Sequence, residues 1–121
     1  MPPPDTILTQ GVGQKGTIRE VVDGEGTAFT FECYTLREAA EALYKTPLTL
    51  RRWIKEGFVP AMTLHDTSFN YGQYARGELN AMARVLAEHE QEYQYLRKEH
   101  EDTIRRLCSQ VNRYRQQKGI R

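Results

Sequence analysis

A cluster of cationic and hydroxyl side chains in residues 49–55 has the composition and spacing needed to contact double-stranded DNA. These residues are Thr49, Arg51, Arg52 and Lys55. Arginine and lysine bind phosphates, an arginine can also donate two hydrogen bonds to a guanine, and threonine can bond to either. We therefore predict a helix that enters the major groove. The residues just before it, Lys45 and Thr46, are further candidate contacts.

Two short helices joined by a tight turn are predicted to position these side chains. Thr35 and Glu38 have the spacing of a capping box, which marks the start of the first helix. Thr46 is a second N-cap, followed by Pro47 at the first helical position, and Gly57 ends the second helix. A helix pair of this kind, with a basic second helix, is typical of helix-turn-helix DNA-binding proteins.

The order of residues around this second helix carries a family resemblance. Thr-Leu-Arg begins at Thr49, an aromatic follows at Trp53, and Glu-Gly-Phe-Val-Pro ends at Pro60. Further on, residues 71–79 (YGQYARGEL) contain two aromatics three residues apart, followed by an acidic residue and a leucine. This order resembles the DNA-binding part of MerR-type regulators and of phage excisionases, over roughly residues 34–90. The resemblance implies a winged helix-turn-helix over 35–75, with Arg51 as a DNA-contact residue.

The predicted wing, residues 61–74, departs from the family in charge. Gly72 and Gln73 stand where the family usually carries an arginine, whereas Arg52 stands where the recognition helix usually has an aromatic. A wing tip commonly reaches phosphates or the minor groove, so Tyr71 and Gln73 are candidate DNA contacts. Packing of Tyr71 and Tyr74 against Trp53 is the alternative role for these two rings.

The N-terminal third lies outside the family pattern. Residues 1–16 are proline- and glycine-rich and are predicted to be a flexible arm. Two β-rich runs flank a turn at 23–26, which predicts a β-hairpin over 17–34. An isolated hairpin is marginally stable in water, so we expect it to pack on the helices or on a partner.

Residues 76–118 are predicted to form one long helix, with no Pro or Gly from Glu78 to Lys118. Along this helix a set of mostly apolar residues recurs at alternating spacings of three and four, which is typical of a two-stranded coiled coil. This stripe includes Leu79, Met82, Leu86, His89, Tyr93, Leu96, His100 and Leu107. Acids gather in 88–102 and bases in 105–121, so an antiparallel pair brings opposite charges together. We therefore predict an antiparallel coiled-coil homodimer, with residues 119–121 as a tail.

Composition and motifs argue against several classes of protein. The chain has 121 residues, a formal net charge of +1 and two distant cysteines, Cys33 and Cys108. This pattern indicates a reducing cytoplasm, and no apolar run reaches the ~20 residues that a membrane helix needs. The three histidines fall on the wing tip and the coil seam rather than in a cleft, so we expect no enzyme. No metal, cofactor or small-molecule ligand is expected.

The fold class predicted from the sequence is mainly α with a small β component. It comprises a winged helix-turn-helix head, an N-terminal β-hairpin and a long C-terminal coiled-coil dimerisation helix. The predicted function is sequence-specific binding of double-stranded DNA by a MerR-like transcriptional regulator without an effector domain. The alternative is a phage excisionase-like architectural factor or a small terminase subunit for DNA packaging. A dimer favours the regulator, and a ring of eight or more subunits favours packaging.

Overall fold

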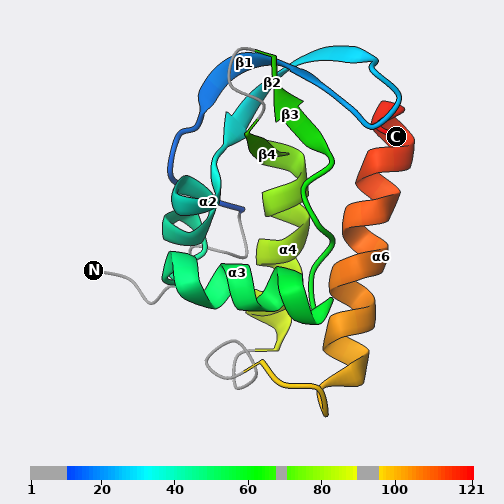
Figure 1. Cartoon of the computed structure of the whole chain (residues 1–121). Coiled ribbons are helices and arrows are strands. Elements are labelled where there is room, and N and C mark those ends of the chain that lie inside the picture. The colour runs from blue at the N-terminus through cyan, green and yellow to red at the C-terminus, as the bar shows by residue number, and fades with distance from the viewer. Residues whose placement is uncertain (1–10, 68–70, 90–95) are drawn as a thin grey trace.

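The computed structural model describes residues 11–67, 71–89 and 96–121, which form a closed β-barrel with helices packed below it and along one side (Figure 1). The strands are β1 (Thr17–Val22), β2 (Ala28–Tyr34), β3 (Leu64–Asp66) and β4 (Gly72–Ala75). The helices are α2 (Leu36–Ala42), α3 (Pro47–Glu56), α4 (Arg76–Glu88) and α6 (Glu101–Lys118). The C-terminal end of α6 reaches the barrel, and α3 lies at the opposite end of the molecule.

The hairpin predicted over 17–34 is confirmed, because β1 and β2 pair antiparallel along their whole length. Its turn is organised by Asp23, which is only 4% exposed. The Oδ1 atom of Asp23 accepts hydrogen bonds from the backbone N–H groups of Glu25 and Thr27, at 3.0 and 2.9 Å. A short acidic side chain that bonds to the backbone just after it is a common way to build a turn.

The wing predicted over 61–74 does contain an antiparallel hairpin, formed by β3 and β4. The prediction of a wing is nevertheless wrong, because both strands belong to the barrel. Val21 of β1 lies opposite Asp66 of β3, and Cys33 of β2 lies opposite Ala75 of β4. The strand order β1-β2-β4-β3 therefore closes on itself. Closure pairs the backbone groups that a projecting hairpin leaves exposed at its edges, which removes two edge strands at once.

The C-terminal residues take part in the barrel. The small hydrophobic cluster there consists of Val21, Cys33, Leu64, Ala75 and Ile120. Gly119 ends α6 in the left-handed conformation, φ 72°, and turns the chain inward. The N–H of Arg121 then donates to Oδ2 of Asp23 at 2.8 Å. Residues 119–121 therefore pack against the barrel, and the prediction of a tail is wrong.

The helix predicted over 76–118 is not continuous, so the predicted fold class is also wrong. α4 ends at Glu88 and α6 begins at Glu101, with His89 as the C-cap of the first and His100 as the N-cap of the second. The stripe that was expected to pair two chains is buried within one chain. Leu79, Met82, Leu86, Leu96 and Leu107 are all 0% exposed. Tyr93 lies outside the described residues.

Ion pairs between α4 and α6 explain why these helices pack against each other within one chain. Arg115 Nε donates to Glu78 Oε2 at 2.6 Å, near the start of α4. Arg106 pairs with Glu88 at the other end of α4. The order of these contacts shows that the helices run antiparallel. Glu88 of the acidic segment 88–102 and Arg106 of the basic segment 105–121 therefore pair within a single chain.

A close approach between α4 and α6 occurs at Gly77. A Cβ atom at this position would lie 2.0 Å from Cε2 of the Tyr114 ring, far below any normal contact distance. The absence of a side chain at Gly77 therefore lets Tyr114 lie directly on the backbone of α4. None of the helices in the described parts of the chain is long and apolar enough to cross a bilayer.

We predict that Ile120→Ala lowers the free energy of unfolding by about 2–5 kcal/mol, the usual cost of truncating a buried isoleucine. Ile120 is 5% exposed, whereas Ile18 on β1 is 73% exposed. Ile18→Ala is therefore the matched control, with an expected change below about 0.5 kcal/mol. Urea unfolding of both variants is the measurement. Equal stability of the two would contradict the role given to Ile120.

We predict that Gly77→Ala destabilises the protein by about 1–3 kcal/mol through overpacking against Tyr114. In a Tyr114→Ala background the same change should be neutral or stabilising by up to about 1 kcal/mol, because alanine is the better helix former. Thermal or urea unfolding of the four proteins completes this double-mutant cycle. The absence of coupling between the two positions would show that α6 does not dock on α4 in this way.

Candidate nucleic-acid interface

The start of α3 is set by the capping groups that the sequence predicts. Thr46 Oγ1 accepts the N–H of Thr49 at 3.2 Å, Pro47 occupies the first turn, and Gly57 ends the helix at φ 77°. The preceding turn holds Tyr44 in the left-handed conformation, φ 57°. A tyrosine in this region costs roughly 1–2 kcal/mol, a cost that the helices packed on either side must offset.

The inner face of α3 is anchored in the main core. Leu50 and Trp53 are both 0% exposed. The Nζ atom of Lys45 lies 5.9 Å from the centroid of the Trp53 ring, a distance at which a cation is attracted to an aromatic face. Partial burial lowers the pKa of Lys45. Lys45 therefore supports α3 from the inside, and less of its side chain is available to DNA than the sequence suggests.

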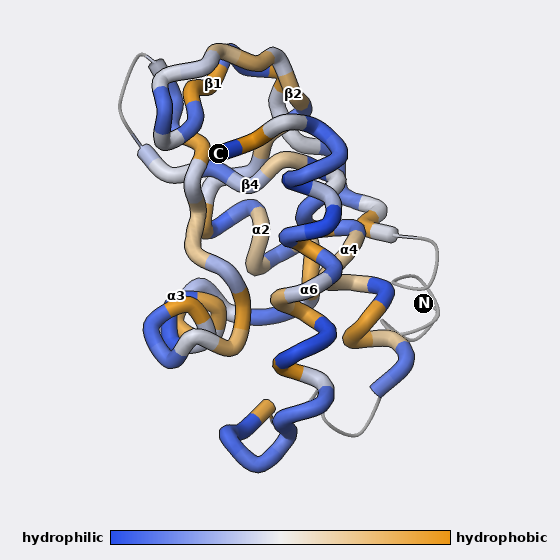
Figure 2. The backbone as a smooth tube through the Cα atoms, turned by 90° about the vertical axis from the view of Figure 1, so that its right-hand side faces the viewer, coloured by the Kyte–Doolittle hydropathy of each residue, from blue (hydrophilic) through white to orange (hydrophobic). Residues whose placement is uncertain are grey.

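The outer face of α3 carries Arg51, Arg52 and Lys55, all exposed. Arg51 and Arg52 precede Lys55 by four and three residues, so each of them neighbours Lys55 on the surface of the helix. Within the part of the chain that the structure describes, none of these three cations forms an ion pair. Figure 2, which looks almost along α3, shows the hydrophilic residues on the side turned away from α4 and α6.

A groove of about 650 Å³ borders this face of α3. Ile54 and Met62 contribute apolar lining, while Arg37 of α2 and Arg51 of α3 bring guanidinium groups to it. Tyr71, just before β4, also lines the groove and is 65% exposed. Tyr71 therefore lies beside the basic helix, and its role as a DNA contact stays a prediction. The tyrosine that packs in the core with Trp53 is Tyr74 instead.

The remaining candidate residues differ in accessibility. Thr46 is exposed and Thr49 is half-buried, and their hydroxyl groups bond to each other at 3.0 Å. Gln73 is only 1% exposed, and its Oε1 accepts a hydrogen bond from Arg19 Nη1 at 3.0 Å. Because β4 is part of the closed barrel, Gln73 packs inside the protein and is not available to DNA. The sequence gives no sign of this burial.

Two residues beside the basic face are missing from the sequence prediction. Arg37 reaches the groove from the first turn of α2. Leu48 is 72% exposed on α3. Its spacing from Arg51, Arg52 and Lys55 puts it on the same side of the helix, so helical periodicity could have identified it. Arg37 could not have been found in this way, because only the packing of α2 beside α3 brings it to the groove.

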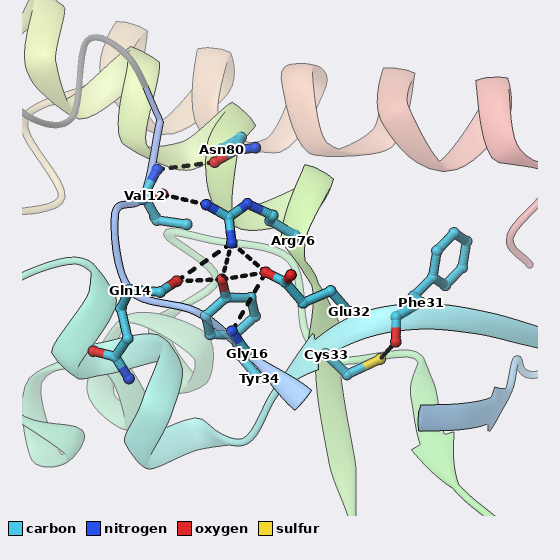
Figure 3. A network of polar contacts seen from close by, with 9 residues as sticks. All are labelled: Val12, Gln14, Gly16, Phe31, Glu32, Cys33, Tyr34, Arg76 and Asn80. Atoms are coloured by element: carbon cyan, nitrogen blue, oxygen red, sulfur yellow. Dashed lines mark hydrogen bonds and ion pairs between the residues drawn. The ribbon is translucent and has the colours of Figure 1, made fainter. Parts of the chain in front are cut away.

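A second polar cluster, centred on Arg76, holds the N-terminal segment (Figure 3). The guanidinium of Arg76 pairs with Glu32, lies 2.8 Å from Tyr34 Oη and donates to the carbonyl of Val12 at 2.7 Å. Tyr34 Oη also donates to the carbonyl of Gln14 at 2.5 Å. Residues 11–16 are therefore bound to β2 and α4. The prediction of a flexible arm is wrong for these residues, and 1–10 lie outside the described residues.

The chemistry of the Arg76 cluster is structural. Arg76 keeps the pKa of Glu32 below its ordinary value, so the carboxylate is ionised at neutral pH. Burial, followed by the bond to Glu32, raises the pKa of Tyr34 to about 12. Burial also raises the pKa of the nearby Cys33 thiol to about 11. An ionised acid bonded to an arginine, with neutral phenol and thiol groups beside it, provides no activated nucleophile.

No family model, no curated protein and no solved structure matches this chain. The resemblance to MerR-type and excisionase-like proteins therefore stays a prediction from the sequence. The interface described above depends on the geometry of α3 and its neighbours.

We predict that the Arg76 cluster makes stability depend on pH. The pKa of Glu32 is lower in the folded protein than its ordinary value of 4.5. Its ionised form therefore stabilises the fold above that pH, and this stabilisation is lost as the pH falls through the lower folded value. The stability difference between wild type and Glu32→Gln should be largest at pH 7 and should shrink on acidification to pH 3.

Urea unfolding at a series of pH values between 3 and 7 measures this difference. Glu41→Gln, at an exposed position on α2, is the control for a change of the same chemistry. Its effect should stay below about 0.5 kcal/mol. A Glu32→Gln protein that is as stable as wild type at pH 7 would contradict the role of the ion pair.

Proposed function

We propose that this protein binds double-stranded DNA sequence-specifically through the exposed face of α3, and that it acts as a transcriptional regulator. The observation that carries the proposal is the set of cations on that face, Arg51, Arg52 and Lys55, none of which forms an ion pair with another described residue. α3 is held from behind by Leu50 and Trp53, both fully buried. The cations therefore project from a rigid support, the arrangement that a helix needs to present side chains to a groove.

The dimensions of α3 fit the major groove. Its 10 residues span about 15 Å at 1.5 Å per residue. A major groove about 12 Å wide admits one α-helix, and its base edges are within reach of arginine. Bringing Arg51 and Arg52 to DNA breaks no ion pair between described residues, so the gain from phosphate contact is not offset by a lost internal bond.

Neighbouring groups can extend the contact beyond α3. Arg37 and Tyr71 lie along the groove that borders α3, on α2 and next to β4. Both side-chain types commonly donate to phosphate oxygens. A DNA backbone running along this side of α3 would meet donors from three parts of the chain, and contacts of this kind fix the register of a recognition helix.

The coiled-coil route to a homodimer is not proposed, because Leu79, Met82, Leu86, Leu96 and Leu107 form the core of a single chain. A dimer stays a prediction and requires another surface. The same α3 face would also serve an excisionase-like or packaging factor. The mass of the complex with DNA separates these uses, since a monomer or dimer fits the regulator and a ring of eight or more subunits fits packaging.

We predict that Arg51→Ala and Arg52→Ala weaken DNA binding while leaving the fold intact. Loss of a phosphate contact should reduce the slope of log affinity against log salt by roughly one. Loss of a bidentate base contact should cost about 1–3 kcal/mol and relax specificity at one position. Fluorescence anisotropy with a duplex selected from random DNA, at several salt concentrations, measures both effects.

Arg84→Ala is the matched control. Arg84 is exposed on α4, outside the α3 face, and removing it changes the net charge of the protein by the same amount. Its salt dependence should equal that of wild type. If Arg51→Ala and Arg52→Ala fold normally and bind as tightly as wild type, or if Arg84→Ala weakens binding as much as they do, α3 is not the DNA-binding element.

A further inference from the structure

The basic face of α3 contains one large apolar side chain, Leu48. It is 72% exposed and lies in the first turn of the helix. The distances in sequence to Arg51, Arg52 and Lys55 are three, four and seven residues, which place all four side chains on one side of α3. Along this side of α3, Leu48 is therefore followed by cations.

Packing does not account for Leu48. The apolar contacts of α3 with the core come from its opposite side, where Leu50 and Trp53 are fully buried. The groove beside α3 is lined by Pro47 and Ile54 and does not include Leu48. A single exposed leucine is common on protein surfaces and carries no argument by itself. Its place at the N-terminal end of the basic face is what gives it meaning, because that face is the one proposed to enter DNA.

The major groove offers an apolar side chain one specific partner. Each base pair presents donors and acceptors there, but only thymine presents a methyl group. The residues near the N-terminus of a recognition helix are the ones that contact base edges, and Leu48 is among them in α3. Resting on the proposed function, we propose that Leu48 reads a thymine by contact with its 5-methyl group.

The geometry of the helix also places this thymine relative to the base read by arginine. Leu48 and Arg51 are three residues apart, or about 4.5 Å along the helix axis. Successive base pairs are about 3.4 Å apart. A helix lying along the groove therefore sets the thymine one or two base pairs from the guanine that Arg51 contacts. The binding site should contain a thymine and a guanine at this separation.

Replacement of thymine by uracil tests the inference, because it removes the methyl group and keeps every hydrogen bond. A site is first selected from random duplex DNA with the wild-type protein. Each thymine of that site is then replaced singly by uracil, and affinity is measured by fluorescence anisotropy at fixed salt. We expect one replacement to weaken wild-type binding by about fourfold, the loss that corresponds to one buried methyl group.

Variants at position 48 assign the effect to this side chain. Leu48→Ser should bind the thymine and uracil duplexes equally, whereas Leu48→Met should keep the preference for thymine. Ile18→Ser is the matched control, because Ile18 is 73% exposed on β1. It should behave as wild type. Thermal unfolding confirms that each variant is folded.

The outcomes separate this inference from the proposed function. Specific binding with no sensitivity to uracil at any thymine overturns the inference and leaves the proposed function intact. The same holds if Leu48→Ser keeps the wild-type response to uracil. If the wild-type protein selects no duplex sequence and binds no duplex DNA, the proposed function fails, and the inference fails with it.

Discussion

The buried ion pair between Glu78 and Arg115 is the interaction on which the placement of the other elements depends. Glu78 is 0% exposed, and its second oxygen accepts the N–H of Ala75 at 2.9 Å, which caps α4. Arg115 also donates to the carbonyl of Ala61 at 2.6 Å. Burial raises the pKa of Glu78, while Arg115 opposes that rise. Removal of either partner from a buried pair leaves an uncompensated charge, at a typical cost of about 3–5 kcal/mol.

This ion pair connects the two ends of the fold. By holding α6 against the start of α4, it directs the C-terminal end of α6 to the barrel, where Ile120 fills the small hydrophobic cluster. Arg115 also binds the segment that follows α3. The Sγ atom of Cys108 lies 3.8 Å from the carbonyl of Gly57, where α3 ends. α6 thus supports both the barrel and the back of the proposed DNA-binding helix, which explains how so small a core can hold an exposed helix rigidly.

Two groups of described cations differ in their contacts: arginines that pair with acids inside the fold, and exposed cations on α3. Arg19 and Arg76 pair with acids at the barrel, and Arg106 and Arg115 pair with acids of α4. Such pairs serve the fold, because each arginine joins segments that are distant in the sequence. The described cations on the outer face of α3 form no such pair, and an exposed leucine lies among them. The difference between these paired arginines and the cations of α3 supports the proposal that α3 binds DNA, which offers anionic phosphates and the methyl groups of thymine. The modest net charge of the protein does not.

The sequence by itself determined the local elements, because short-range chemistry specifies them. The capping groups around Thr35 and Thr46, the end of α3 at Gly57 and the hairpin over 17–34 follow from neighbouring residues. The tertiary structure alone decided how the elements combine. Apolar residues that recur every three or four positions predict that one face of a helix is buried. They do not predict whether a second chain or the same chain covers that face. No Pro or Gly marks the interval between α4 and α6, so the sequence predicts one continuous helix there. The burial of Gln73 likewise required barrel closure, which depends on strand pairs far apart in the sequence.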